Sequence, residues 1–478
     1  MISFIVSIIV LVVAYFTYGK FIEKVFGVEK ERITPALRLR DDVDFMPLPT
    51  WRIFLIQFLN IAGLGPIFGA IAGAMFGPAA FLWIVLGSVF AGAVHDYFSG
   101  MLSVRHDGLS ISEVVGIYLG TNVKHIMRVF TVILLIFVGT VFLMGPAKII
   151  DGMTDNIWSI WVWVVIILTY YIVSTLLPID KLISKIYPVF GVAMLLMAVG
   201  LIIALFFGDY HIPELVPENL INMTSNPEET PLFPILFVTI ACGAISGFHA
   251  TQSPLMARCM KNENLGRKIF YGTMITEGVV ALIWAAAAMT FFGSVEALNG
   301  AMTANSNNAA WAANEISLNM LGKVGGVLAL LGIVAAPITS GDTAFRSARL
   351  ILADIFKLNQ IKIKNRLYLS IPLFVIAFVL TQIDFGIIWR YFAWSNQTLA
   401  MVVLWGITAF LIYEGKAYWI SGIPALFMTM VCSTYILIAP EGFNLDNDVA
   451  YLGGGLVTIC TTVLFWVYTT KRKRKNEV

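Results

Sequence analysis

The stretch NIAGLGPIFG, residues 60–69, interrupts an apolar segment that runs from Trp51 to about Met75. Its three glycines and one proline weaken a helix, because proline lacks a backbone N–H and glycine has no side chain to pack. Backbone groups freed at membrane depth must face protein or a water-filled cavity, and secondary transporters build their binding sites at such breaks. A second interrupted segment, ACGAISGFHATQSP, covers residues 241–254. The sequence therefore predicts two broken membrane helices.

The composition is that of a polytopic membrane protein. Of the 478 residues, 59% are hydrophobic and 13% are charged, and the mean hydropathy is +0.84. A net charge of +2 gives no basic field for nucleic acid, and we interpret the basic run at 471–475 as a topology signal that can touch anionic lipid. The four cysteines have no metal-site or redox spacing, so we expect them to be packing residues: Cys242, Cys259, Cys432 and Cys460.

Apolar segments close to the roughly 20 residues that cross a bilayer recur along the chain. We predict about thirteen spans, near residues 2–18, 51–75, 79–104, 128–147, 157–177, 186–207, 232–256, 269–292, 322–345, 367–382, 386–412, 418–438 and 451–470. Alternate connections are basic, as at 20–40 and 258–268, whereas the others are neutral or acidic, as at 209–229. By the positive-inside rule, this alternation places the N-terminus outside and the C-terminus in the cytoplasm, which requires an odd number of spans.

The two broken spans enter the membrane from opposite sides, five spans apart. A five-span unit used twice in this way must be inverted the second time, as in many secondary transporters. We therefore predict an all-α membrane protein with inverted repeats at 51–207 and 232–412. Residues 1–50, one span and a cytoplasmic loop, and residues 413–478, two spans and a basic cytoplasmic tail, are expected to be peripheral. The external connection at 293–320 is either a surface loop or a lid over the pathway.

One face of the ninth span carries hydroxyl groups at helical spacing. Ala336, Thr339, Ser340 and Thr343 share this face, so one carbonyl and two or three hydroxyls could surround a small cation opposite the first broken helix. Serine and threonine in membrane helices also bond to their own preceding turn or hold neighbouring helices together. Both interpretations stay open at the level of sequence.

Several ionisable side chains fall inside predicted spans. His95 and Asp96 lie in the third span and Glu277 lies in the eighth. An unpaired charge at mid-helix costs roughly 2.5–3.5 kcal/mol, so each needs a partner, water or a proton. Proton transfer and structural ion pairing both remain possible roles. Asp342 is expected to pair with Arg346, four residues later near the cytoplasmic end of its span, or to accept a proton.

Polar groups at the two breaks and in the eleventh span are candidates for substrate binding. The half-helix amino ends near Gly65 and Gly247 would present backbone amides to a carboxylate. His249 bonds to freed backbone, contacts substrate or titrates, and the amides of the eleventh span either bridge helices or line a pathway. The candidate residues are Asn60, Gly63, Gly65, Gly243, Ser246, Gly247, His249, Asn396 and Gln397.

Enzyme signatures are missing from the sequence, which contains no GxSxG, HExxH or phosphate-binding loop. We therefore expect neither an enzyme nor an ATP-driven pump, and no cofactor. The function class that remains is transport driven by an ion gradient.

Several segments resemble the carbon starvation protein A family, bacterial inner-membrane transporters linked to uptake of peptides or pyruvate. The similar stretches are IAGLGPIFGAIAGAMFG (61–77), AGAVHDYFSGMLSVRHDGLS (91–110), ACGAISGFHATQS (241–253), YGTMITEG (271–278), PITSGDTAFRSARL (337–350) and FAWSNQTLA (392–400). This resemblance implies the fold of the amino acid–polyamine–organocation superfamily, a LeuT-like core of five-plus-five inverted repeats with a broken first helix in each.

The resemblance also implies candidates for the coupling ion. Sodium-coupled members of that superfamily hold one ion between the first and eighth core helices. The metal-site candidates by this similarity are Ala336, Thr339 and Ser340, with backbone carbonyls near Ala62 and Gly65 facing them. Some family members are thought to use protons, for which the candidates are His95, Asp96, Glu277 and Asp342. This chain departs from the family in having His95 where others have glutamine, and many members are longer at the C-terminus.

The sequence thus predicts a secondary active importer of short peptides or a pyruvate-like carboxylate, working by alternating access on a sodium or proton gradient. We expect a multi-pass protein of the bacterial plasma membrane, in contact with lipid and not with nucleic acid. A passive channel and a transporter-like nutrient sensor are the alternatives.

Overall fold

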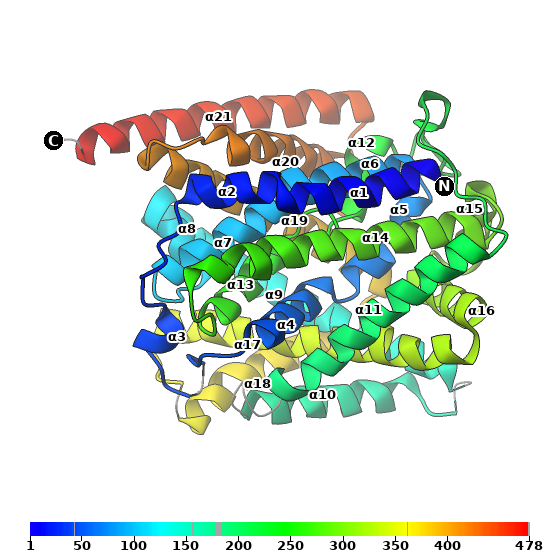
Figure 1. The fold of residues 1–478 in the computed structure, drawn as a ribbon, viewed down its shortest axis with the longest axis horizontal. Coiled ribbons are helices and arrows are strands. Elements are labelled where there is room, and N and C mark those ends of the chain that lie inside the picture. The colour runs from blue at the N-terminus through cyan, green and yellow to red at the C-terminus, as the bar shows by residue number, and fades with distance from the viewer. Residues whose placement is uncertain (43, 155–156, 177–182, 361, 477–478) are drawn as a thin grey trace.

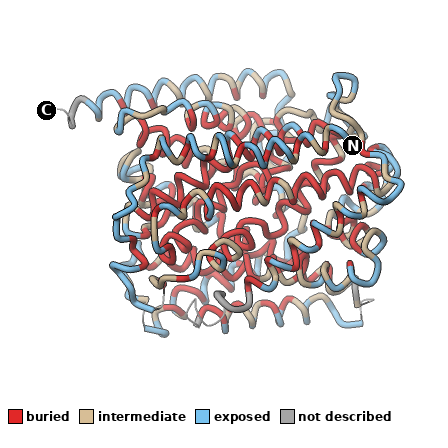
Figure 2. Tube along the Cα trace, viewed as in Figure 1, coloured by how far each residue is buried: buried red, intermediate tan, exposed pale blue. Residues whose placement is uncertain are grey.

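The computed structural model describes residues 1–42, 44–154, 157–176, 183–360 and 362–476. These residues form helices and no strands, and the long helices run side by side along the longest axis of the molecule (Figure 1). Buried residues fill the interior, whereas exposed ones mark the outer helices and the ends of the bundle (Figure 2). The start of α1 and the end of α21 lie at opposite ends of this axis.

Helices occur in each of the thirteen predicted segments. In the first half of the chain they are α1 (Ile2–Phe16), α2 (Tyr18–Phe26), α3 (Pro35–Arg38), α4 (Thr50–Ala62), η1 (Gly65–Gly69), α5 (Ala70–Ala74), α6 (Ala79–Leu86), η2 (Gly87–Gly92), α7 (Ala93–Arg105), α8 (Ile111–Leu119), α9 (Thr121–Met153), α10 (Ile160–Leu176) and α11 (Ile183–Phe207). In the second half they are η3 (Pro217–Asn219), α12 (Leu232–Thr239), α13 (Gly247–Ala257), η4 (Glu263–Leu265), η5 (Arg267–Tyr271), α14 (Gly272–Phe291), α15 (Val295–Ala304), α16 (Ala309–Ala329), η6 (Leu330–Ala335), α17 (Ala336–Phe356), α18 (Ile363–Leu380), α19 (Phe385–Tyr413), α20 (Trp419–Ile438) and α21 (Asn447–Asn476).

The protein spans a membrane several times. Among the described residues, ten helices are long and apolar enough to cross, and α4 with the helix that follows it makes an eleventh candidate, bent by 50°. Of the other two predicted spans, one holds the shorter apolar helix α10, and the other is divided between α12 and α13. The count of thirteen crossings therefore stays a prediction.

Both predicted breaks are present. Helix α4 ends at Ala62 because Gly63 follows it with a φ of +22°, and the chain resumes as a wide π-helical turn at Gly65–Gly69. The second break covers residues 240–246, which are not helical, and its Gly243 has a φ of +93°. These two positive φ values are conformations that side-chain-bearing residues rarely adopt.

The two breaks pack directly against each other. A Cβ atom on Gly65 would lie 2.0 Å from the Cβ of Cys242, and one on Gly69 would lie 3.0 Å from the carbonyl oxygen of Thr239. Glycine is therefore required at Gly65 by close approach rather than by backbone angle. The interrupted segments, which are far apart in sequence, form one contact at the core of the bundle.

The connection at 293–320, for which the sequence left a surface loop and a lid open, is largely helical. Ser294 caps α15 by accepting a hydrogen bond from the Ala297 N–H, and Asn308 caps α16 in the same way. The buried Asn299 side chain donates to the carbonyl oxygens of Met75 and Met223, at 3.0 and 3.2 Å. This segment is thus fastened to the chain just beyond the first broken helix.

The connection between α11 and α12 folds back onto the start of the chain. Glu214 accepts hydrogen bonds from the Met1 ammonium, from the backbone of Ile2 and Ser3, and from the Ser3 hydroxyl. These donors, the ammonium first, lower the pKa of Glu214 to about 2. The carboxylate therefore fixes the beginning of α1.

Substituting Glu214→Gln is expected to lower the melting temperature at pH 7. Because the pKa is lowered in the folded state, the stabilisation is complete above the usual glutamate pKa and is lost as the pH falls towards about 2. The difference in melting temperature between the parent and the variant should therefore shrink from pH 5 downwards. Glu218→Gln, at an exposed position in the same connection, is the control; a Glu214→Gln deficit that persisted unchanged at pH 2 would contradict the charge effect.

Candidate functional site

Four ionisable side chains form a continuous buried chain inside the bundle. Asp96 on α7 lies between two imidazoles: Nδ1 of His95 is 2.8 Å from Oδ1, and Nδ1 of His249 on α13 is 2.9 Å from Oδ2. The other ring nitrogen of His249, Nε2, is 3.5 Å from Oε2 of Glu277 on α14. All four side chains are 0% exposed. We call this group the imidazole–carboxylate chain.

The second break positions the imidazole–carboxylate chain. His249 lies in the first turn of α13, directly after the break. The end of η2, where α7 begins, approaches the break closely, since a Cβ on Gly92 would lie 2.1 Å from the Ala244 carbonyl oxygen. Polar side chains of the third predicted span bind the carbonyls that the break frees. The Ser88 hydroxyl donates to Gly243 at 2.8 Å, and the Trp83 indole donates to Ile240 at 3.0 Å.

The imidazole–carboxylate chain can change its charge by single protons. Burying an ionised group without a partner costs several kcal/mol, so two carboxylates and two imidazoles in contact are sensitive to how many protons they share. Imidazole is the side chain that exchanges protons most readily near neutral pH, and groups in contact titrate as a unit. Of the predicted proton-coupling residues, the structure thus unites His95, Asp96 and Glu277, and it adds His249, which was predicted for substrate.

Cys242 belongs to this site, although we expected it to be a packing residue. Its sulfur, a ligand atom of His249 and a ligand atom of Glu277 all lie within 4.8 Å of one another. The thiol also donates to the Ser246 hydroxyl at 3.4 Å. The sequence signal was its position inside the second break, next to Gly243, rather than any spacing to another cysteine.

The predicted substrate amides bond to backbone and side chains at the second break. Asn396 on α19 accepts from the Phe248 N–H at 2.7 Å and from the Ser246 hydroxyl at 3.1 Å, so it caps α13 at Gly247. The Gln397 side-chain amide donates to the Phe237 carbonyl at 2.8 Å. In this conformation, both amides bridge helices, the first of the two roles left open by the sequence.

Substituting Asn396→Ala is expected to destabilise the protein by roughly 1–3 kcal/mol, because it leaves the buried Phe248 N–H without its acceptor. Thermal unfolding in detergent measures this loss. Ser395→Ala, the neighbouring buried position on α19, is the control. Equal melting temperatures for the two variants would contradict the capping role.

The predicted cation face of α17 does meet the first broken helix. The Ser340 hydroxyl donates to the Leu59 carbonyl at 3.0 Å, and the hydroxyls of Ser340 and Thr339 both donate to the Ala336 carbonyl, at 3.3 and 2.6 Å. The Thr343 hydroxyl donates to the Ser340 carbonyl at 3.0 Å. The serine and threonine hydroxyls thus bond to their own preceding turn and to the neighbouring helix, as the second interpretation expected, and their oxygens keep lone pairs for a cation.

Other residues predicted at the first break lie beside this face. A Cβ on Gly63 would lie 3.5 Å from the Ser340 hydroxyl oxygen, which places Ala62 and Gly63 opposite α17. Asn60 is fully buried, with its side-chain oxygen 3.5 Å from the Thr343 hydroxyl. Gly65 instead faces Cys242 in the second break. The predicted cation face of α17 and the predicted substrate site at the second break are therefore neighbours, with the first break between them.

Asp342 is buried, and not at the end of its helix as the sequence suggested. It is 2% exposed, and its Oδ2 accepts from the hydroxyls of Ser174 on α10 and Tyr187 on α11, each at 2.6 Å. Arg346 lies 3.9 Å from Asp44 and donates to the Ser174 carbonyl. Tyr187 also donates to the Thr339 carbonyl at 3.1 Å, which joins Asp342 to the hydroxyl face.

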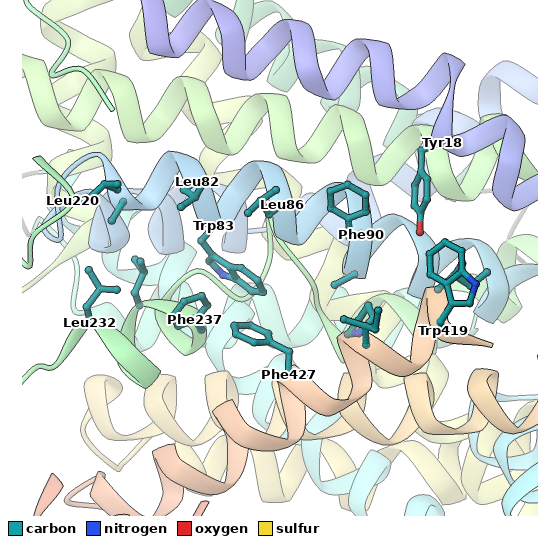
Figure 3. A pocket seen from close by; sticks show the side chains of 16 residues that line it. Tyr18, Leu82, Trp83, Leu86, Phe90, Leu220, Leu232, Phe237, Trp419 and Phe427 are labelled. Atoms are coloured by element: carbon teal, nitrogen blue, oxygen red, sulfur yellow. The ribbon is translucent and has the colours of Figure 1, made fainter. Parts of the chain in front are cut away.

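An apolar groove of about 480 Å³ lies outside this polar region, between α6, α12 and α20 (Figure 3). Leucine, phenylalanine and tryptophan side chains line it, among them Leu82, Phe90, Phe237 and Phe427. Its lining residues include no charged side chain and none of the predicted site residues. A carboxylate substrate would find no charged partner there, so we place the candidate functional site at the two breaks.

Comparisons with known proteins agree with a transporter. A protein-family model described as "Carbon starvation protein CstA" matches residues 1–160 and 146–387. An uncharacterized membrane protein of Haemophilus influenzae is 43% identical over 351 residues, which are 64% of this chain and 95% of that protein. The peptide transporter CstA of Bacillus subtilis is 26% identical, over 84% of this chain and 83% of its own. The pyruvate/proton symporter BtsT of Escherichia coli is 27% identical, over 58% of this chain and 47% of its own.

The fold is also similar to a solved transporter. A crystal structure of a mutant manganese transporter of Eremococcus coleocola matches with a TM-score of 0.52 and 14% sequence identity, over 91% of this chain and 99% of that one. At this identity, the likeness concerns the fold alone. The named relatives are transporters and not enzymes. With the family model covering most of its length, the chain belongs to the carbon starvation protein CstA family.

Proposed function

We propose that the protein imports a small carboxylate nutrient, a short peptide or a pyruvate-like acid, and that protons bound by the imidazole–carboxylate chain drive this import. The observation that carries the proposal is the unbroken contact from His95 through Asp96 and His249 to Glu277, all fully buried beside the second break. The relatives named for peptide transport and for pyruvate/proton symport support the substrate class and the ion.

Coupling follows from the position of His249. It lies in the first turn of α13 and contacts both carboxylates, so a proton gained by the imidazole–carboxylate chain changes the charge at the end of a half-helix. Added positive charge there favours the approach of a substrate carboxylate, and the amides at the half-helix end add to this attraction. Proton and substrate would then bind together and leave together, which is the requirement for symport.

For the fold, we propose a LeuT-like core of inverted repeats at 51–207 and 232–412 with thirteen crossings. The broken α4–η1 and α12–α13 segments, five predicted spans apart, support it, as does the similarity to the manganese transporter fold. The start of α1 and the end of α21, at opposite ends of the bundle, agree with an odd number of crossings (Figure 1). We further propose that the protein lies in the bacterial plasma membrane with its N-terminus outside.

Sodium is the second candidate for the coupling ion, because the Ser340 face meets the first break through its contact with Leu59. Sodium would take hydroxyl and carbonyl oxygens of this face, which keep free lone pairs while Ser340 and Thr339 bond to Ala336. We favour the proton, because the groups of the imidazole–carboxylate chain are in contact and one relative is named as a pyruvate/proton symporter.

Uptake by the purified protein in proteoliposomes tests both ions. Labelled pyruvate and labelled dipeptides are supplied in turn, while the sodium gradient and the pH gradient are imposed separately. We expect accumulation above equilibrium with an inward proton gradient at equal sodium. Accumulation that requires sodium and ignores pH would assign coupling to the Ser340 face. Uptake that only equilibrates under every gradient would support a passive channel, and binding without uptake would support a sensor.

A further inference from the structure

Three potential metal ligands of different chemistry meet at the second break. The Cys242 sulfur, a ring nitrogen of His249 and a carboxylate oxygen of Glu277 lie within 4.8 Å of one another, and Cys242, His249 and Glu277 are all buried. They come from the break itself, from α13 and from α14, so tertiary packing and not sequence spacing brings them together. Thiolate, imidazole and carboxylate together are a donor set typical of zinc and of similar divalent ions.

The imidazole is oriented as in metal sites. Asp96 holds Nδ1 of His249 at 2.9 Å, which leaves Nε2 directed towards Glu277. Within the described residues, this Nε2 makes no hydrogen bond, because 3.5 Å to Glu277 is longer than such a bond. A carboxylate that binds the far nitrogen of a ligating histidine fixes its tautomer and strengthens it as a ligand. A buried nitrogen without a hydrogen bond calls for an explanation, and a role as a metal ligand supplies one.

The sulfur also has a supporting contact. Ser246 lies 3.4 Å from the Cys242 sulfur, and the Asn396 side-chain amide lies 2.9 Å from the Ser246 hydroxyl oxygen. Three protein ligands leave a fourth tetrahedral position open, as in zinc sites that bind water or another small ligand. Contacts from Asp96 and Ser246 thus orient two of the three candidate ligands.

We propose that Cys242, His249 and Glu277 bind one divalent transition-metal ion of the zinc class. This site goes beyond the proposed transport function. Metal binding requires a deprotonated thiol and a free imidazole nitrogen, so it competes with protons for His249 and Glu277. Because these ligands are fully buried, the ion enters only when the second break opens.

Cobalt(II) binding to the full-length protein in detergent tests the site without any ion gradient. The parent protein for this test carries Cys259→Ser, Cys432→Ser and Cys460→Ser, so that Cys242 is its single thiol. After treatment with a chelator, we expect one cobalt ion per chain and a thiolate-to-cobalt charge-transfer band in the near ultraviolet. Asp96→Asn should weaken the binding by roughly 10–100-fold, because it removes the carboxylate that supports His249.

Cobalt bound without this band, or no stoichiometric cobalt in the folded single-thiol protein, would overturn the proposal. Cys242→Ser in the wild-type background should abolish the band, whereas Cys432→Ser, a buried thiol on α20, should keep it. If Cys242→Ser does not fold, the cobalt stoichiometry and the charge-transfer band of the single-thiol protein still test the proposal. These measurements do not depend on transport, so a negative result in the uptake assay leaves them valid, and the reverse also holds.

Discussion

Substituting Glu277→Gln is expected to abolish proton-driven accumulation of substrate while leaving exchange of labelled for unlabelled substrate in place. Glutamine keeps the shape of the side chain but cannot take a proton from His249, 3.5 Å away. One proton per substrate anion sustains about tenfold accumulation for each pH unit across the membrane, since one unit is worth about 1.4 kcal/mol. The variant should therefore equilibrate substrate at every imposed pH gradient. Uptake and counterflow in the same proteoliposomes measure the two activities.

Two further variants define what Glu277 does. Glu277→Asp keeps a titratable group in the imidazole–carboxylate chain and should therefore retain part of the accumulation. A purely structural role would not predict this result. Glu296→Gln, at an exposed position on α15, should accumulate substrate like the parent. If Glu277→Gln still concentrates pyruvate or dipeptide against a pH gradient, protons do not pass through Glu277. Loss of exchange together with accumulation would instead assign Glu277 to substrate binding or to folding.

The broken helices were predictable because their cause is local. Glycine and proline at residues 63–66 and glycine at 243 and 247 act on their own turns of backbone, whatever surrounds them. The hydroxyl face of α17 was likewise predictable, because residues three and four apart share one side of a helix. The contact of Ser340 with Leu59 then confirmed that this face lies against the first broken helix.

The imidazole–carboxylate chain was not predictable, because its contacts are tertiary. Asp96 and His249 are 153 residues apart, and only the packing of α7 against α13 pairs them. The same cause explains Cys242, which no spacing rule connects to Glu277. Local rules also misled at Asp342, where an i,i+4 pair with Arg346 was expected. There, the hydroxyls of Ser174 and Tyr187, on other helices, lie 2.6 Å from the carboxylate. The spacing of residues within one helix cannot predict such contacts.

Substituting Gly65→Ala is expected to prevent normal folding and uptake, although it adds a single methyl group. That group would lie 2.0 Å from the Cβ and 2.4 Å from the sulfur of Cys242. Because a Cβ is fixed to its backbone, Cys242 cannot rotate it away, and one of the two breaks must move. Overpacking of a core commonly costs about 1–3 kcal/mol and occasionally more. Thermal unfolding and gel filtration in detergent measure the loss, and uptake reports its effect on transport.

A compensating change separates this steric effect from a general sensitivity of the membrane helices. In the double variant Gly65→Ala with Cys242→Gly, the Cβ and sulfur that the new methyl group would meet are removed, so the melting temperature should recover most of the loss. Gly455→Ala on α21, where a Cβ meets nothing within 4 Å, should leave stability unchanged or raise it by up to about 1 kcal/mol. A Gly65→Ala protein that melts with the parent would show that the breaks do not touch. A folded double variant that binds no cobalt would show that Cys242 is a ligand as well as a packing partner of Gly65.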